Sequence, residues 1–288
     1  VTIARGCDNH CSYCIVPYVR GKERAHSSDF IIDSVRKLVN EGVVEITLLG
    51  QNVNSYSCDG ADFPDLLSRV SQETDVRRIR FMTSHPKDLS NKLVDLTASE
   101  PKVMPHIHLP MQAGANRVLK RMGRVYTIEH YHGIVEYIRE KLDYVCLTTD
   151  LIVGFPGETE QEYEQTLDAV RKVQFDSAFM FRYSVRPGTG AAQFDDDVAE
   201  EDKIRRLNKL ISIQQEISRK RNQRELNQVR FSLVEGASRR DPGVMRARTE
   251  GNKTVLFKSD TVAVGSIVPV RIIEADAFTL HGQVEELN

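Results

Sequence analysis

Three of the five cysteines in the chain lie close together, at Cys7, Cys11 and Cys14, in the pattern C-x3-C-x2-C. Three thiolates at this spacing can bind zinc or an iron–sulfur cluster. A structural zinc site takes four ligands, and His10 can supply the fourth, but compact zinc modules usually draw their ligands from two separated pairs. No second pair is present in the sequence, because Cys58 and Cys146 are each isolated.

An iron–sulfur cluster of the 4Fe-4S type ordinarily takes four cysteines, so three cysteines would leave one iron open. An open metal position is typical of catalytic rather than structural sites. We therefore interpret the three cysteines as ligands of a catalytic cluster and keep zinc as the alternative. The odd cysteine count and the tight spacing also argue against a disulfide framework and favour a reducing, cytoplasmic location.

The composition sets the broad class of the protein. The chain has 288 residues, of which 40% are hydrophobic and 28% charged, and its net charge is −2. These values predict a soluble globular protein with more than one domain, and no apolar run approaches the length of a membrane span. Because the chain begins with Val rather than Met, we expect it to be part of a longer protein.

Strand-like and helix-like segments alternate over the first two thirds of the chain. Apolar, β-branched runs predict strands at 1–6, 43–50, 77–84, 106–111, 147–154 and 175–184. Helical periodicity predicts helices at 27–42, 63–73, 92–99, 116–122, 127–142 and 158–173. Six such β/α units imply a parallel sheet with helices outside it, as either a partial barrel or a doubly wound sheet.

Polar or glycine-rich loops follow these strands one after another. After the cysteines come GQNVNSY, SHP, QAGA, GFPGE and SVRPGTG. Barrel enzymes build their sites from the loops at the carboxyl ends of the strands. We therefore predict an α/β fold with a partial (β/α)6 barrel of the TIM-like type and a site at this rim.

The last part of the chain has a different pattern of predicted elements. A long charged helix at 199–225 precedes five short strands at 228–236, 243–249, 254–259, 266–275 and 278–284, which predict a small all-β barrel of the OB type. We place the first domain at 1–225 and the second at 226–288. Residues 226–258 contain seven Lys or Arg against three acids, which suits RNA phosphates. The candidate RNA contacts are Arg239, Arg240, Arg246 and Arg248.

Several segments resemble a known family. CDNHCSYC resembles the C-x3-C-x-aromatic-C signature of the radical S-adenosylmethionine (SAM) superfamily, with Tyr13 in the aromatic position. EITLLGQNVNSY, HLPMQAGANRVLKRMGR, DLIVGFPGETEQEY and FRYSVRPGTGA resemble the methylthiotransferase family, and LLGQNVNSY is similar to its tRNA-acting, MiaB-type branch. VEGASRR and FTLHGQV resemble a TRAM domain, a small RNA-binding β-barrel. The resemblance covers nearly the whole chain.

This resemblance implies a fold and a reaction. The partial barrel would be of the radical SAM type, with one 4Fe-4S cluster on Cys7, Cys11 and Cys14 and SAM at the open iron. Reduction of SAM would give a 5′-deoxyadenosyl radical, and a methylthio group would be added to C2 of N6-isopentenyladenosine adjacent to the anticodon. The implied partners are the tRNA anticodon stem-loop, SAM and an electron donor such as flavodoxin or ferredoxin. We expect a monomer.

The resemblance also implies residues that bind SAM or substrate at the rim. They are Tyr13, Gly50, Gln51, Ser84, Gln112, Gly154, Phe155, Pro156 and Arg182. Gln51 stands where the superfamily more often has an acid. His85 follows Ser84 and is a further rim candidate, whereas His106 and His108 alternate on a strand and are interpreted as structural or rim residues.

Full-length members of the family have an N-terminal domain with three more cysteines that bind a second 4Fe-4S cluster. We expect that domain to be missing from this chain, which should then cleave SAM without completing methylthiolation. Two other hypotheses stay open. One is a methylthiotransferase that acts on a ribosomal protein or on threonylcarbamoyl-adenosine in tRNA, and the other is a zinc-stabilised RNA-binding module.

Overall fold

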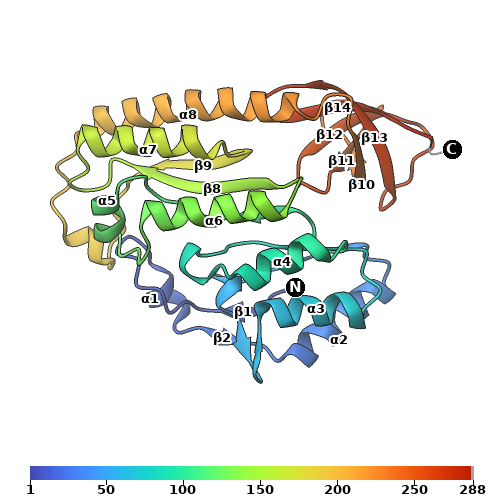
Figure 1. Cartoon of the computed structure of the whole chain (residues 1–288), viewed down its shortest axis with the longest axis horizontal. Helices are drawn as coiled ribbons and strands as arrows, with labels where there is room; N and C mark the ends of the chain where they lie inside the picture. Colours follow the sequence, from blue (N-terminus) through green and yellow to red (C-terminus); the bar gives the residue numbers. More distant parts are fainter. Residues whose placement is uncertain (287–288) are drawn as a thin grey trace.

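The computed structural model describes residues 1–286 and contains two packed domains (Figure 1). The helices are α1 Val16–Arg20, α2 Ser28–Asn40, α3 Phe63–Glu73, α4 Asn91–Ser99, α5 Asn116–Arg121, α6 Ile128–Lys141, α7 Glu160–Val173 and α8 Glu200–Gln223, with 3-10 turns η1 Val53–Ser55, η2 Pro86–Asp88 and η3 Gly190–Gln193. The strands are β1 Ala4–Arg5, β2 Arg24–Ala25, β3 Glu45–Leu48, β4 Ser57–Cys58, β5 Ala61–Asp62, β6 Arg78–Phe81, β7 His106–His108, β8 Cys146–Val153, β9 Ser177–Arg182, β10 Val229–Ala237, β11 Val244–Arg248, β12 Thr254–Lys258, β13 Ile267–Ala275 and β14 Thr279–Val284.

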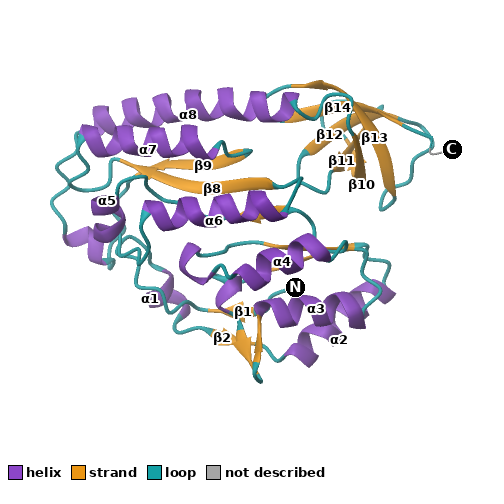
Figure 2. Cartoon of the chain, in the orientation of Figure 1, coloured by secondary structure: helices purple, strands orange, loops and turns teal. Residues whose placement is uncertain are grey.

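The first domain is a partial parallel barrel. β3 pairs with β6, and β7, β8 and β9 form a second parallel sheet. Parallel bridges join Thr2 to Leu49 and Ile79 to Val103, so the strand segments follow one another in sequence order from the first to the sixth. The helices lie on the outside of these strands (Figure 2). The predicted partial barrel is confirmed.

The first strand is shorter than predicted. The segment 1–6 forms only the two-residue strand β1, which pairs antiparallel with β2. The reason is Gly6, whose φ of +79° turns the chain out of the extended conformation immediately before Cys7. The sequence analysis also missed α1 and the small hairpin of β4 and β5.

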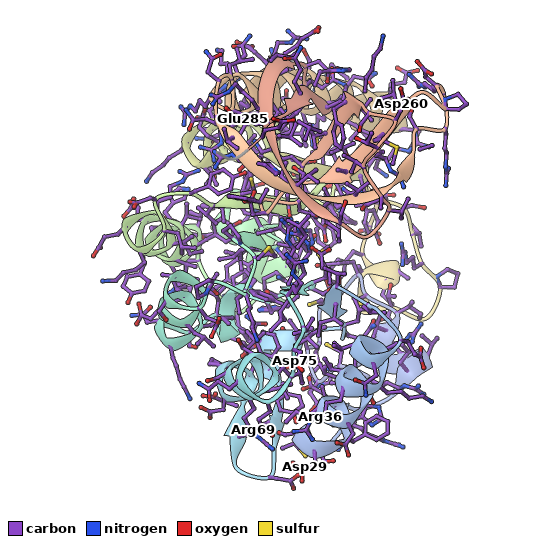
Figure 3. All side chains as sticks on the ribbon, turned by 90° about the vertical axis from the view of Figure 1, so that its right-hand side faces the viewer. Asp29, Arg36, Arg69, Asp75, Asp260 and Glu285 are labelled. Carbon is purple, nitrogen blue, oxygen red and sulfur yellow. The ribbon has the colours of Figure 1, made fainter. Side chains whose placement is uncertain are left out.

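Capping side chains fix the starts of the outer helices. Asp62 and Asp65 form a capping box at α3, and Thr159 and Glu162 form another at α7. The apolar faces of these helices close one core cluster around the parallel strands. Arg69 of α3 also pairs with Asp29 of α2 at 2.9 Å. Figure 3 shows this charged edge at the opposite end of the molecule from Asp260 and Glu285.

The second domain is a closed barrel with strand order β10-β11-β12-β14-β13. Its own small core contains Val234, Ala247, Val255, Phe257, Val270, Ile272 and Leu280. This confirms the predicted all-β barrel. The boundary between residues 225 and 226 stays a prediction, and in the structure it falls between the end of α8 and the start of β10.

Helix α8 connects the two domains along one side of the parallel strands (Figure 1). Near its start Arg206 pairs with Glu158 at 2.9 Å, beyond the carboxyl end of β8. Near its end Arg221 pairs with Asp176 at 3.1 Å, just before the amino end of β9. The helix therefore runs from the carboxyl ends of the parallel strands, which form the rim of the barrel, to their amino ends. None of the helices in residues 1–286 combines the length and apolar character that a bilayer crossing requires.

Candidate cofactor site at the strand ends

The cysteine loop connects β1 to α1 and is held tightly at its base. Gly6 is required there, because a Cβ at this position would lie 2.1 Å from the carbonyl oxygen of Lys22. The backbone N–H of Cys7 donates a hydrogen bond to the carbonyl of Gly21 at 3.1 Å. The two glycines thus bring the two ends of the loop together and leave the cysteines on the segment between them.

The far side of the loop is fastened through Ser12. Its backbone N–H donates to the carbonyl of Met122 at 2.9 Å and its hydroxyl donates to the carbonyl of Arg121 at 2.8 Å. The Ser12 carbonyl accepts a bond from the N–H of Ala191 at 2.7 Å. At Gly123 a Cβ would come within 2.7 Å of the His10 carbonyl, so only glycine allows α5 to end this close to the loop.

The three thiols are half-buried, and a buried cation lies beside one of them. The guanidinium of Arg124 is 3.4 Å from the Cys11 sulfur and also donates to the Tyr126 hydroxyl at 3.1 Å. Burial alone would lower the pKa of Arg124, but Tyr126, Tyr13 and Cys11 together raise it, so its charge persists. Burial raises the pKa of the Cys14 thiol. A cation next to a sulfur ligand stabilises negative charge on it.

The donor set fits a cluster better than a single ion. Among residues 1–286, no three His, Cys, Asp or Glu side chains converge as one metal ion would require. In a 4Fe-4S cluster each cysteine binds a different iron, so the sulfurs need not share one coordination sphere. The other cysteines lie elsewhere. Cys58 lies in the hairpin of β4, and Cys146 is buried at the start of β8, where burial raises its pKa to about 12.

The predicted rim residues lie at the carboxyl ends of four successive strands. Gly50 and Gln51 follow β3, Ser84 follows β6, Gln112 follows β7, and Gly154 follows β8. Ser84 is buried, and its hydroxyl has no hydrogen-bond partner within residues 1–286. The structure thus brings these residues to one edge, while their contacts with SAM stay predictions.

Two residues of this rim adopt an unusual backbone conformation that the sequence analysis missed. Thr83 has a φ of +70° and Gln112 a φ of +67°. A β-branched residue in this region is strained, and such strain gathers at functional sites. Gln112 is held in place by backbone bonds to Asp150 and Ile152, at 2.8 and 2.9 Å.

The GFPGE loop is more buried than a simple contact loop. At Gly154 a Cβ would lie 2.4 Å from the side chain of Lys203, and its N–H donates to Glu158 at 2.6 Å. Burial raises the pKa of Glu158 to about 7. Phe155 is fully buried, and its ring packs edge-on against Tyr13 with 6.5 Å between centroids. The Phe155 ring therefore belongs to the core and supports Tyr13.

Other predicted contacts are already paired within the chain. Arg182 forms an ion pair with Glu200 of α8 at 2.8 Å, and Pro156 accepts a bond from Arg121 at 3.1 Å. In the small barrel Arg246 and Arg248 both reach Glu235 at 3.0 Å. Arg239 and Arg240 are exposed on the turn between β10 and β11. Of the predicted RNA contacts, these two present their charge most openly.

The inner face of the barrel carries a row of histidines. His106 and His108 are buried, and both rings contact the Thr148 hydroxyl, at 3.2 and 3.0 Å. Their interpretation as structural or rim residues stays a prediction. Burial, followed by Arg80 and His108, lowers the pKa of His106 to about 3. His85 is also buried, and burial, Arg124 and Lys87 lower its pKa to about 3.

The amino ends of the strands are closed by the small barrel. Arg80 of β6 donates to the carbonyls of Thr249 and Glu250 at 2.7 and 2.8 Å, and its Nε lies 3.0 Å from Glu45. Beside it, Lys253 of the small barrel pairs with Asp176 at 3.0 Å. Burial alone would raise the pKa of Asp176, but Lys253 and Arg221 outweigh it and the pKa is lowered.

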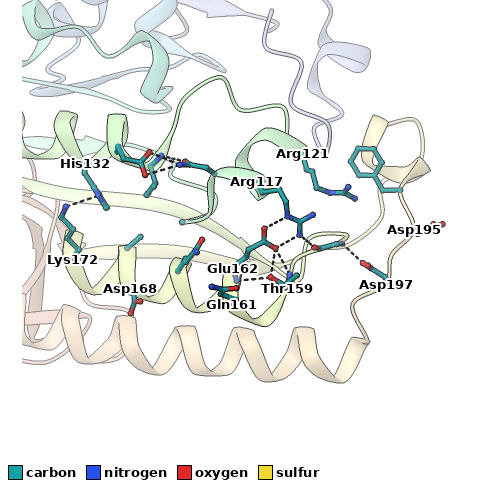
Figure 4. Close-up of a pocket in the computed structure, with 18 residues that line it drawn as sticks. Arg117, Arg121, His132, Thr159, Gln161, Glu162, Asp168, Lys172, Asp195 and Asp197 are labelled. Atoms are coloured by element: carbon teal, nitrogen blue, oxygen red, sulfur yellow. Dashed lines mark hydrogen bonds and ion pairs between the residues drawn. The ribbon is translucent and has the colours of Figure 1, made fainter.

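A large cavity that is not lined by any of the cysteines lies on the outside of the barrel. It is a groove of about 1280 Å³ between α5, α6 and α7 (Figure 4). Several of its charged side chains already have partners in the chain, for example Arg117 with Glu162 at 2.5 Å and Asp168 with Arg171 at 2.7 Å. Because the groove does not reach the cysteine loop or the inner face, we do not assign it to the chemistry.

Comparison with known proteins identifies the family of the chain. Residues 1–170 match the family model of the Radical SAM superfamily, and residues 223–284 match that of the TRAM domain. The chain therefore belongs to the radical SAM superfamily. More particularly, it is homologous to tRNA-2-methylthio-N(6)-dimethylallyladenosine synthases, with 47% identity to that of Pelotomaculum thermopropionicum and 49% to that of Carboxydothermus hydrogenoformans.

These two alignments cover 98% of the chain but only 64% and 65% of the relatives. The chain thus spans just under two thirds of the length of the curated relatives it matches. Solved structures share the fold at low identity. A radical SAM methyltransferase from Kitasatospora setae superposes with a TM-score of 0.55 at 17% identity, over 66% of this chain and 38% of that one. Coproporphyrinogen III oxidase from Escherichia coli gives 0.53 at 13%, over 77% and 60%.

Proposed function

We propose that this chain performs the SAM-cleaving and base-binding part of tRNA methylthiolation, with N6-isopentenyladenosine adjacent to the anticodon as the target. The observation that carries the proposal is the cysteine loop, which holds Cys7, Cys11 and Cys14 half-buried at the carboxyl ends of the parallel strands. The choice of target rests on the relatives, which are named for this modification and share 47–49% identity with the chain.

The three cysteines would hold the cluster, and the iron without a cysteine would take SAM. With both bound, the cluster and SAM supply reductive cleavage of the sulfonium carbon–sulfur bond. The chain's own residues keep the loop in place through Ser12 and Gly123 and put the charge of Arg124 beside Cys11. The Ser84 hydroxyl and the strained backbone at Gln112 offer polar groups at the same rim.

The small barrel would hold the RNA. Its exposed Arg239 and Arg240 suit phosphate contacts, and an unpaired anticodon loop allows one base to be splayed out toward the rim. This combination favours tRNA over a ribosomal protein as the substrate. Cys58 and Cys146 do not extend the cluster site, because they lie in separate strands, and Cys146 is buried.

The test is the production of 5′-deoxyadenosine by the anaerobically reconstituted chain with SAM and a reductant. We expect the isopentenylated anticodon stem-loop to stimulate it more than the threonylcarbamoylated stem-loop or a ribosomal protein. If only one of the other two substrates stimulated the reaction, the proposed target would be wrong and that substrate would replace it. Absence of SAM cleavage by an iron-loaded chain would refute the enzymatic function.

A further inference from the structure

The inner face of the partial barrel carries two exposed phenylalanines on its last strand. Phe179 and Phe181 of β9 are 56% and 53% exposed. Ala178 and Met180, which alternate with them, pack against the core instead. Because side chains alternate along a strand, the two phenylalanines share the face opposite the helices. Large apolar side chains gathered on a concave face mark a ligand site more often than scattered exposed ones.

Polar groups lie directly beside this pair. Phe179 is opposite Asp150 on β8, and Phe181 is opposite Ile152. The His108 ring packs edge-on against Phe179 with 6.0 Å between centroids, and its Nε2 lies 3.5 Å from an Asp150 carboxylate oxygen. An apolar wall with a carboxylate at its edge suits an aromatic ring that carries an N–H donor.

A cavity lies between Phe179, the phenylalanine nearer the amino end of β9, and the small barrel. It measures about 230 Å³ and is lined by Phe179, Ser177 and Thr148 on one side and by Arg248, Asn252 and Lys253 on the other. The second set comes from the domain that matches the TRAM family model. A ligand against Phe179 is therefore next to the domain that would hold RNA.

We propose that Phe179 and Phe181 form the wall that receives the flipped-out adenine together with its apolar N6 substituent. This inference rests on the proposed function and adds the residues that would distinguish a prenylated adenine from an unmodified one. Stacking on an aromatic ring stabilises a base, and the apolar substituent covers the remaining phenyl surface. The Asp150 carboxylate accepts the hydrogen bond from the N6–H that the substituted amine retains.

The experiment compares the binding of two fluorescently labelled anticodon stem-loops that differ only in the isopentenyl group, by anisotropy. We expect the unaltered chain to prefer the isopentenylated RNA. The double variant Phe179→Ala, Phe181→Ala should bind that RNA about tenfold more weakly, since a lost base–aromatic stack costs roughly one order of magnitude or more. It should lose most of the preference.

The matched control is Phe30→Ala. Phe30 is 55% exposed on α2, outside the barrel, and its loss should leave both affinities unchanged. A double variant that keeps the full preference would overturn the inference and leave the proposed function standing. Failure of the unaltered chain to bind either RNA would overturn the proposed function, and the inference with it. Unchanged thermal melting of the variants shows that the fold is intact.

Discussion

At the carboxyl ends of the parallel strands the chain leaves three thiols half-buried and one buried hydroxyl without a partner, whereas at the amino ends it pairs buried charges with one another. The cysteine loop and the Ser84 hydroxyl belong to the first end. Arg80 and the Lys253–Asp176 pair belong to the second, where both join the first domain to the small barrel. The contrast indicates that the carboxyl ends of the strands are suited to bind a ligand, whereas the amino ends bind the small barrel.

The largest effect is expected at the open end. Cys11→Ala should abolish cluster binding, because two cysteines cannot hold a 4Fe-4S cluster with one iron open. The measurement is iron, sulfide and zinc per chain after anaerobic reconstitution, with roughly four irons and four sulfides expected before the change. Cys58→Ala is the control and should leave the iron content unchanged. Stoichiometric zinc without iron would favour the RNA-binding module instead.

The next largest effect is expected at the closed end. Arg80→Met should lower the free energy of unfolding by about 3–5 kcal/mol, since it removes the nearer ion-pair partner of the largely buried Glu45 carboxylate and the charged donor to two carbonyls of the small barrel. Urea denaturation measures this change. Arg77→Met removes the same charge from an exposed position and should cost far less. Iron binding should be the same in both variants, and a loss of iron in Arg80→Met alone would break the separation of the two ends.

The closed end should also make the protein sensitive to acid. The pKa of His106 is about 3 in the folded chain against 6.5 as its ordinary value. The stability that follows from keeping this ring neutral is present above pH 6.5 and is lost as the pH falls toward 3. For one residue this amounts to at most about 5 kcal/mol.

His106→Gln should therefore flatten the decline in unfolding free energy between pH 7 and pH 5, as measured by urea denaturation at each pH. His130→Gln, at an exposed position on α6, serves as the control. An equal slope in the His106 variant and the unaltered chain would count against this origin of the acid sensitivity.

The smallest effect concerns the outer surface of the small barrel. Arg239→Gln with Arg240→Gln should weaken RNA binding severalfold and reduce the slope of log affinity against log salt by about one per lost phosphate contact. Arg246→Gln should change the slope less, because Glu235 already neutralises that side chain. A larger effect at Arg246 than at the two turn arginines would contradict the proposal that RNA phosphates contact the turn.

The two ends also differ in how far the sequence predicts them. The cysteine loop and the rim glycines could be identified because their spacing and residue types are local signals. Arg80 could not be interpreted, because its partners are backbone carbonyls about 170 residues later in the chain. Phe179 and Phe181 were predicted to belong to an apolar strand, and the pattern of that strand did not show that both side chains are more than half exposed on its inner face. Contacts between distant parts of the chain and the exposure of single side chains thus could not be predicted from local sequence patterns.

Helix α8 adds a consequence of its own. It has 24 residues, so it is about 36 Å long, and ion pairs fix it near both ends. The helix therefore fixes the distance between the rim and the small barrel. A free nucleoside is too short to contact the rim and the small barrel at once, whereas a molecule tens of ångströms long can contact both. Under the proposed function, this distance favours a substrate long enough to contact both the rim and the small barrel.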